Sequence, residues 1–155
     1  MSATITSEKT TIDVHMTKSD PSVAQEEIRK GLLSFPRFLP TKYLYDTRGS
    51  ELFELICELP EYYQTRTEFE ILSKHADEIV LLSKANELVE LGSGAATKTR
   101  ILLDAMQRAN QLNFYVPFDV SEGIVRRVAQ ELAEEYSGLR VHGVVGDFLS
   151  HLEHI

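Results

Sequence analysis

The chain has 155 residues, 43% hydrophobic and 26% charged, which is the composition of a globular domain with a core of its own. Its formal net charge of −8 argues against a nucleic-acid partner, because such proteins neutralise phosphates with an excess of basic side chains. One cysteine, Cys57, excludes a disulfide within the chain, no apolar run approaches the roughly 18 residues of a membrane span, and the polar N-terminus lacks a secretory signal, so we expect a cytoplasmic protein.

Residues 1–19 are polar, rich in Thr and Ser, and without hydrophobic periodicity. We interpret them as a flexible extension, although their few β-branched residues could also dock as an arm. Asp20 and Pro21 then predict the start of a helix, because Asp is a good N-cap and Pro fits the first helical position. This helix is expected to reach Leu33, after which two prolines make the chain extended.

Two further helices are expected before the sequence changes character. Ser50 can cap a short helix over residues 51–59, which Pro60 ends. Thr65 and Glu68 then have the spacing of a capping box. The helix that follows has residues at alternating steps of three and four that predict a core-facing stripe: Phe69, Leu72, Ala76, Ile79 and Ser83.

From residue 87 onward, short apolar runs alternate with helical patterns. The runs predict strands over residues 88–91, 114–118 and 139–145. This β-α-β-α-β order predicts an α/β fold with a parallel sheet and right-handed crossovers. Ser121 is expected to cap the helix between the second and third strands.

We therefore divide the chain into three parts. Residues 1–19 are the flexible extension, residues 20–86 are a helical segment that contributes to the functional site, and residues 87–155 are the first half of a Rossmann-like domain.

Several chemically distinctive residues fall just beyond the carboxyl ends of the predicted strands, where ligands of parallel sheets bind. Gly92 and Gly94 allow a tight turn and a close approach of the backbone to a ligand. Asp119 could accept hydrogen bonds from both hydroxyls of a ribose, or cap the next helix. Asp147 could accept a hydrogen bond from an exocyclic amine and Phe148 could cover a purine face; alternatively, they are a helix cap and a core ring.

Taken together with Glu90, this acid pattern favours an S-adenosylmethionine fold over a dinucleotide oxidoreductase. Thr97 stands where a nicotinamide site would prefer a glycine, and such a site does not need Asp147. Lys98 lies in the first helical turn after the loop, where a cation is unfavourable next to the helix dipole. It could bind an anion such as the carboxylate of the cofactor, or it could simply be solvated.

Other reactive side chains give weaker signals. Tyr62 and Tyr63 could shape a site for a substrate amine by hydrogen bonding or cation–π contact, or could anchor their loop by packing. His151 and His154 are two potential ligands near the end of the chain and do not make a metal site, so we expect no metal. Cys57 is expected to be a core thiol.

Five ordered motifs of the sequence now identify a family. They are LPTKYLYDTRGSELF at 39–53, LPEYYQTRTE at 59–68, ELGSG with KTR within 90–100, PFDV at 117–120 and GDF at 146–148. This set resembles the histidine-specific methyltransferases, the histidine Nα-methyltransferases of ergothioneine biosynthesis. The resemblance covers roughly residues 25–155.

The resemblance implies a role for each matching position. In the family, the glycine loop and the lysine after it contact the methionine part of S-adenosylmethionine, the next acid binds the ribose, and the Asp-Phe pair binds the adenine. A tyrosine of the second motif lines the junction between cofactor and substrate amine. The corresponding residues here are Gly92 and Lys98 for methionine, Asp119 for ribose, Asp147 and Phe148 for adenine, and Tyr62 for the amine. Gly94 belongs to the same loop and is also expected to bind the cofactor.

The resemblance also implies the reaction. Three successive methyl transfers from S-adenosylmethionine to the neutral α-amine of L-histidine would give hercynine, with catalysis by positioning, no metal and no covalent enzyme intermediate. We assign no catalytic residue.

Members of the family are longer than this chain, so the resemblance implies that it corresponds to their N-terminal half. We expect the full-length enzyme to be a monomer whose partner is a small molecule. We expect the 155 residues alone to be poorly stable or to associate, because the first strand would become an unpaired apolar edge. The alternatives are a related N-methyltransferase acting on a tryptophan derivative and a truncated, non-catalytic nucleotide-binding module.

Overall fold

The computed structural model describes residues 3–6, 9–16, 21–44, 47–148 and 150–155. Its strands are β1 Ala3–Thr6, β2 Thr10–Val14, β3 Glu87–Leu91, β4 Phe114–Asp119 and β5 Arg140–Val145. Its α-helices are α1 Pro21–Leu33, α2 Thr47–Glu58, α3 Gln64–Ser83, α4 Thr99–Arg108 and α5 Glu122–Glu135. Two short 3₁₀ helices, η1 Thr41–Leu44 and η2 Leu152–His154, complete the described elements.

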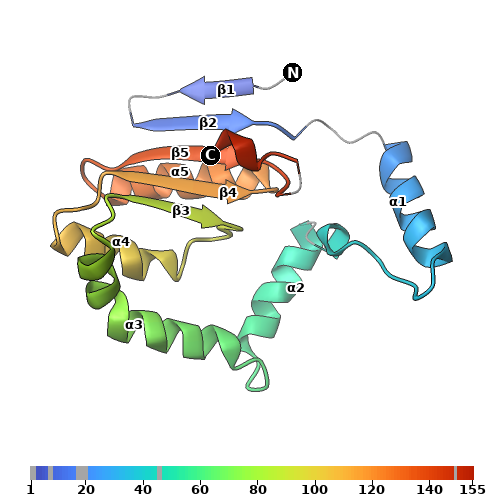
Figure 1. The fold of residues 1–155 in the computed structure, drawn as a ribbon, viewed down its shortest axis with the longest axis horizontal. Coiled ribbons are helices and arrows are strands. Elements are labelled where there is room, and N and C mark those ends of the chain that lie inside the picture. Colours follow the sequence, from blue (N-terminus) through green and yellow to red (C-terminus); the bar gives the residue numbers. More distant parts are fainter. Residues whose placement is uncertain (1–2, 7–8, 17–20, 45–46, 149) are drawn as a thin grey trace. The chain divides into compact units, whose positions relative to one another are not determined.

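The five strands form one sheet in the order β1-β2-β5-β4-β3 (Figure 1). β2, β5, β4 and β3 are parallel, and β1 pairs with β2 antiparallel. The predicted β-α-β-α-β unit is therefore confirmed as β3-α4-β4-α5-β5, a partial Rossmann-like methyltransferase fold. Because the strands are parallel, their carboxyl ends lie along one edge of the sheet.

The N-terminal segment departs from the prediction. Residues 10–14 are not a flexible extension, since β2 pairs with β5 from Thr10 opposite Val141 to Val14 opposite Val145. Ile12 is buried in the core beside this pairing. The alternative of a docked arm is the correct one, and it covers the edge of β5 that would otherwise be unpaired.

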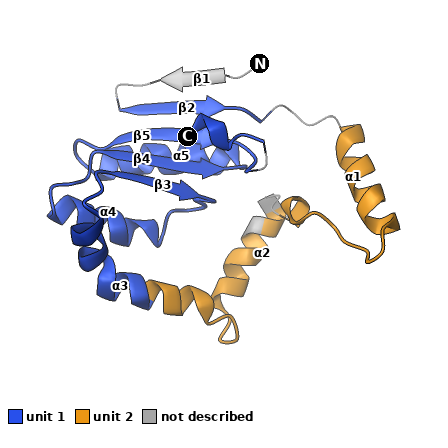
Figure 2. Cartoon of the chain, viewed as in Figure 1, with its two compact units in different colours: residues 1–17, 70–155 blue, residues 18–69 orange. Residues whose placement is uncertain are grey.

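The chain divides into two units (Figure 2). Unit 1 comprises residues 1–17 and 70–155, and unit 2 comprises residues 18–69. The division therefore differs from the predicted boundary at residue 86, because most of α3 belongs with the sheet. Its Ala76 and Val80 are buried against Ala105 and Met106 of α4.

Unit 1 owes its core to the apolar runs of β4 and β5 and to one face of α5. Val125, Val128 and Leu132 on α5 are completely buried, as are Tyr115 on β4 and Leu139 just before β5. Phe118 and Val144 form a separate cluster with Val116. Burial of side chains from both central strands is the pattern expected when a parallel sheet is covered on both faces.

Unit 2 contains α1, η1, α2 and the first residues of α3. Glu27 on α1 accepts a hydrogen bond from the Tyr43 hydroxyl at 2.6 Å and pairs with Lys42 Nζ at 2.8 Å, which ties η1 to α1. α2 begins at Thr47, so Ser50 lies inside the helix and not at its N-cap position. The predicted cap Asp20 lies outside the described residues. In the part of the chain that the structure describes, no helix is long and apolar enough to cross a membrane.

β3 is the outer strand at the other side of the described sheet. Its register is defined by β4 alone, and Val89 and Leu91 are 46% and 52% exposed. An apolar strand with an unpaired row of backbone N–H and C=O groups is a template for pairing with another chain.

We therefore expect the 155-residue chain by itself to self-associate, as measured by size-exclusion chromatography with light scattering. Val89→Lys should shift it toward the monomer, because a lysine on an outer strand disfavours edge-to-edge pairing. Ile71→Lys is the control, since Ile71 is as exposed but lies on α3. A monomeric, cooperative thermal transition of the unaltered 155 residues would contradict the expectation.

Candidate functional site

The carboxyl ends of β3, β4 and β5 bring the predicted site residues together. The backbone N–H groups of Gly92 and Ser93 donate to the Phe118 carbonyl at 2.8 and 3.2 Å. The Gly146 N–H donates to the Asp119 carbonyl at 3.0 Å. The loops after the three strands are therefore joined at this edge, with Gly92, Asp119 and Asp147 in adjacent positions.

The loop after β3 depends on its glycines. Gly92 and Gly94 have φ angles of +76° and +47°, the left-handed region that side chains disfavour. Ala96 shares this region with φ +52°, although it is not a glycine. The loop thus leads from the end of β3 to the start of α4, where the first N–H groups of a helix can face a ligand.

Asp119 joins this loop to the next helix. One carboxylate oxygen accepts a hydrogen bond from the Gly94 N–H at 3.1 Å, and the other accepts one from the Ser121 N–H at 2.9 Å. Ser121 is the N-cap of α5, as predicted from the sequence, but its side chain makes no capping hydrogen bond. The Asp119 carboxylate performs part of that function and also fixes the glycine loop.

Asp147 and Phe148 follow β5 at the same edge. The Phe148 ring stacks on Phe118 with centroids 5.3 Å apart, and its side chain is 45% exposed. A Cβ atom on Gly92 would lie 3.6 Å from the Phe148 ring. Because it is this exposed, Phe148 is not a core ring. The short distance from Gly92 shows that the ring lies beside the glycine loop, with part of its surface open.

A buried hydrogen-bonded cluster underlies the loop and was not predicted. The Glu90 carboxylate accepts hydrogen bonds from the Thr99 hydroxyl at 2.6 Å and from the Tyr115 hydroxyl at 2.5 Å. Burial raises the pKa of Glu90, while the hydrogen bonds from Thr99 and Tyr115 and the charge of Lys98 oppose the rise. The pKa of Tyr115 is also raised, first by burial and then by Glu90, so Tyr115 remains a donor. The cluster ties the start of α4 to β3 and β4.

Lys98 stands at the N-cap position of α4 with helical backbone angles. Its positive charge opposes the rise in the pKa of Glu90, so the ammonium acts on the carboxylate that lies beneath the loop. The sequence prediction located it correctly at the beginning of the helix that follows the glycines.

Histidines from the two ends of the described chain meet at this edge. The His15 ring, just after β2, stacks on His154 with centroids 3.7 Å apart and planes 2° apart. The Asp147 N–H donates to His151 Nδ1 at 2.9 Å. Burial lowers the pKa of His15, and the neighbouring His154 lowers it further. Among the described residues, no group of three or more His, Cys, Asp or Glu side chains could hold a metal ion.

Tyr62 belongs to unit 2, where its ring packs edge-on against Phe53 with centroids 5.9 Å apart. The Arg66 guanidinium donates to the carbonyls of Leu59 and Pro60 at 2.9 and 2.6 Å, and so holds the loop that carries Tyr62. The proposed role of Tyr62 toward a substrate amine stays a prediction.

Comparisons with known proteins bear on what this arrangement does. A family model described as histidine-specific methyltransferase, SAM-dependent, matches residues 24–155. A histidine N-alpha-methyltransferase from Mycolicibacterium smegmatis is 47% identical over 128 residues, which are 83% of this chain and 40% of that protein. Ergothioneine biosynthesis protein 1 of Neurospora crassa is 40% identical over 73% of this chain and 13% of its own length.

A more distant relative acts on another amino-acid derivative. The 4-dimethylallyltryptophan N-methyltransferase of Claviceps purpurea is 27% identical over 139 residues, which are 88% of this chain and 40% of that protein. The chain thus spans about two fifths of the length of the M. smegmatis and C. purpurea relatives.

Proposed function

The chain belongs to the histidine-specific, S-adenosylmethionine-dependent methyltransferases, and from this premise we propose that it provides the cofactor-binding part of an N-methyltransferase acting on the α-amine of L-histidine. The observation that carries the proposal is the junction of the glycine loop with Asp119, where the Gly94 N–H and the Asp119 carboxylate meet at 3.1 Å. It lies at the sheet edge where ligands of parallel sheets bind.

The residues at this edge fit S-adenosylmethionine. The Asp119 carboxylate has the acceptor capacity for two ribose hydroxyls, and the open part of the Phe148 ring suits an adenine face. The Ser93 hydroxyl is buried in the loop and makes no hydrogen bond within the described residues. We assign the methionine part of the cofactor to Gly92, Gly94 and Lys98, and the exocyclic amine of the adenine to Asp147.

S-adenosylmethionine, when bound, supplies an electrophilic methyl group on a sulfonium centre. The chain's own residues would bind and orient. Lys98 would pair with the carboxylate of the methionine part, and Asp119 would fix the ribose, so that the methyl group is held in one direction. The Tyr62 oxygen would accept a hydrogen bond from an N–H of the neutral α-amine, which leaves the nitrogen lone pair free to attack the methyl group. Three transfers would give the trimethylated product, hercynine, of ergothioneine biosynthesis, with one S-adenosylhomocysteine released each time and one proton lost from the nitrogen to solvent after the first and the second transfer.

Composition supports the remaining assignments. A net charge of −8 favours a small-molecule substrate over a nucleic acid, and a single cysteine suits the reducing cytoplasm. We infer that the full-length protein, meaning the natural translation product that contains these residues, acts there as a monomer.

The direct test incubates the purified full-length protein with S-adenosylmethionine and either L-histidine or 4-dimethylallyltryptophan, with products followed by mass spectrometry. We expect successive addition of methyl groups to histidine. Tyr62→Phe should raise the KM for histidine by about tenfold, the worth of one hydrogen bond to a charged or reacting group, while leaving the affinity for S-adenosylhomocysteine unchanged. Tyr63→Phe is the matched control, because Tyr63 is the adjacent phenol and is exposed. Turnover of the tryptophan derivative without turnover of histidine would refute the proposal.

A further inference from the structure

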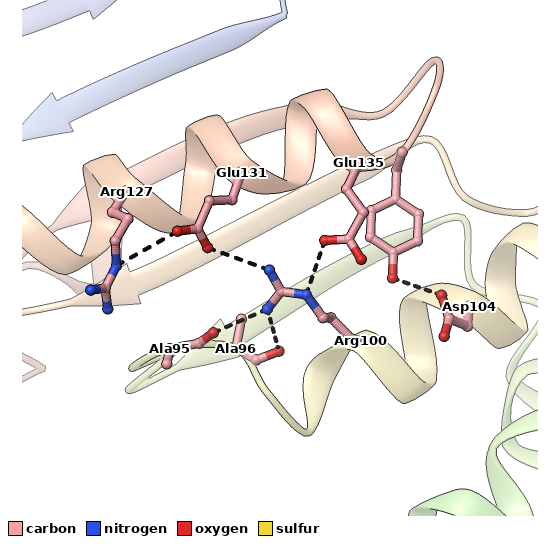
Figure 3. Close-up of polar contacts among 8 residues, drawn as sticks. Ala95, Ala96, Arg100, Asp104, Arg127, Glu131 and Glu135 are labelled. Atoms are coloured by element: carbon pink, nitrogen blue, oxygen red, sulfur yellow. Dashed lines mark hydrogen bonds and ion pairs between the residues drawn. The ribbon is translucent and has the colours of Figure 1, made fainter. Parts of the chain in front are cut away.

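Arg100, in the first turn of α4, has contacts that its motif alone does not explain (Figure 3). Its Nη1 donates to the carbonyls of Ala95 and Ala96 in the glycine loop, at 3.2 and 3.3 Å. Its Nε donates to Glu135 at 3.0 Å and its Nη2 to Glu131 at 3.4 Å, both on α5. One guanidinium therefore joins the loop to a helix more than 30 residues further along the chain.

The loop residue that Arg100 holds is the strained one. Ala96 is 2% exposed and adopts φ +52°. This left-handed conformation is unfavourable for alanine, whereas glycine adopts it without steric cost. Its carbonyl accepts hydrogen bonds from both the side chain and the backbone N–H of Arg100, the latter at 3.2 Å. Strained backbone of this kind persists where its surroundings over-determine it, and such positions cluster at ligand-binding sites.

The orientation of the Ala96 carbonyl also determines that of the next N–H. A trans peptide is planar, so the Thr97 N–H points to the side opposite the Ala96 carbonyl and hence away from the guanidinium. Thr97 and Lys98 are the last residues before α4, where N–H groups and the helix dipole favour an anion.

Two carboxylates on α5 match the forked geometry of the Arg100 guanidinium. Glu131 and Glu135 are one helical turn apart and reach different nitrogens of the guanidinium. The hydroxyl of Tyr136, the residue that directly follows α5, donates to Asp104 on α4 at 2.7 Å, so the end of α5 is joined to α4 a second time. A lysine ammonium at position 100 could not contact two carbonyls and two carboxylates in fixed directions.

We propose that Arg100 is a positioning residue of the cofactor site: it locks Ala95 and Ala96 against α5 and thereby presents the Thr97 N–H, beside Lys98, to the carboxylate of the cofactor. The inference rests on the proposed function for the identity of that ligand. The fixed loop itself does not depend on it. Arg100 touches no reacting atom, and its effect is to reduce the ordering cost of binding.

The test measures S-adenosylhomocysteine affinity of the full-length protein by isothermal titration calorimetry. Arg100→Ala should lose about tenfold in affinity and Arg100→Lys somewhat less, the scale of one charge-assisted hydrogen bond. Arg108→Ala is the matched control and should stay within about twofold, because Arg108 is also on α4 but pairs only with exposed Asp77 among the contacts described. If Arg100→Ala does not fold, Arg100→Lys carries the comparison.

A second substitution separates positioning from plain stabilisation. Ala96→Gly in the Arg100→Ala background should recover part of the lost affinity, because glycine adopts the left-handed conformation without the hydrogen bonds from Arg100. An Arg100→Ala protein that binds within about twofold of the unaltered one would overturn the proposal, as would a loss of affinity that Ala96→Gly leaves unchanged.

Hydrogen exchange of the ligand-free protein distinguishes this proposal from the proposed function. Arg100→Ala should speed exchange of the amides of residues 93–98 relative to those in the middle of α4. If the unaltered protein does not bind S-adenosylhomocysteine, the proposed function fails. If loop exchange is unchanged in Arg100→Ala, the proposal that Arg100 fixes the loop fails, whether or not the ligand binds.

Discussion

Replacing Asp119 with Ala is expected to weaken binding of S-adenosylhomocysteine by about 100-fold, the largest effect of any single side chain at the site. Hydrogen bonds to a charged group contribute about 1.5–3 kcal/mol, and two ribose hydroxyls would share this carboxylate. The same substitution removes the acceptor for the Gly94 and Ser121 N–H groups, so the loop and the start of α5 lose their common partner.

Asp119→Asn separates these contributions. An amide can still accept from one N–H, but its NH2 group would oppose either the other N–H or a ribose hydroxyl. We expect the affinity of Asp119→Asn for S-adenosylhomocysteine, measured by calorimetric titration, to lie between those of the unaltered protein and of Asp119→Ala. Asp77→Asn is the control, because Asp77 is an exposed partner of Arg108 on unit 1. If Asp119→Ala bound the ligand within about fivefold of the unaltered protein, the ribose assignment would be wrong.

Replacing Glu90 with Ala is expected to lower the free energy of unfolding by about 3 kcal/mol. The substitution leaves the Thr99 and Tyr115 hydroxyls without the acceptor that each now has, and an unsatisfied buried hydroxyl costs about 1–3 kcal/mol. Glu90→Gln keeps the shape and one acceptor oxygen, so its loss should be small. Chemical denaturation of the full-length protein measures both.

The pH dependence of the Glu90 variants follows from the raised pKa of this carboxyl. Folding favours the protonated form, so the contribution is present below the ordinary value of 4.5 and is lost as the pH rises through the folded-state pKa. Gln does not titrate. The stability of Glu90→Gln relative to the unaltered protein should therefore increase from acidic to neutral pH. A difference that is constant over this range would contradict a raised pKa of Glu90 in the folded protein.

The parallel β-α-β-α-β unit could be predicted from the sequence because each strand is a short apolar run and each helix has its own periodicity. The positions of Gly92, Asp119 and Asp147 followed from that order, since parallel strands end at one edge. These patterns are local, because each site residue was placed from one strand and the helix that follows it.

Features that depend on distant pairing could be predicted only in part: docking of the N-terminal segment was one of two alternatives, and its partner strand was not predicted. β2 is a short Thr-rich segment, and its partner β5 begins about 130 residues later, as Thr10 opposite Val141 shows. Glu90, Thr99 and Tyr115 form a cluster only after β3, α4 and β4 are assembled.

Helix faces were also displaced by small amounts. The predicted stripe of α3 included Ile79, which is exposed, whereas the adjacent Val80 is buried against α4. Periodicity defines that a helix has an apolar side, but when apolar residues are adjacent the packing partner selects which of them is covered.

The central claim is that the edge formed by the glycine loop, Asp119 and Phe148 binds S-adenosylmethionine and not a nicotinamide dinucleotide. The most direct measurement is calorimetric titration of the full-length protein with S-adenosylhomocysteine and, separately, with NAD. We predict saturable binding of one S-adenosylhomocysteine per chain, weakened about 100-fold in Asp119→Ala, and no binding of NAD. A folded protein that gives no heat with S-adenosylhomocysteine, or that binds NAD saturably, would contradict the account.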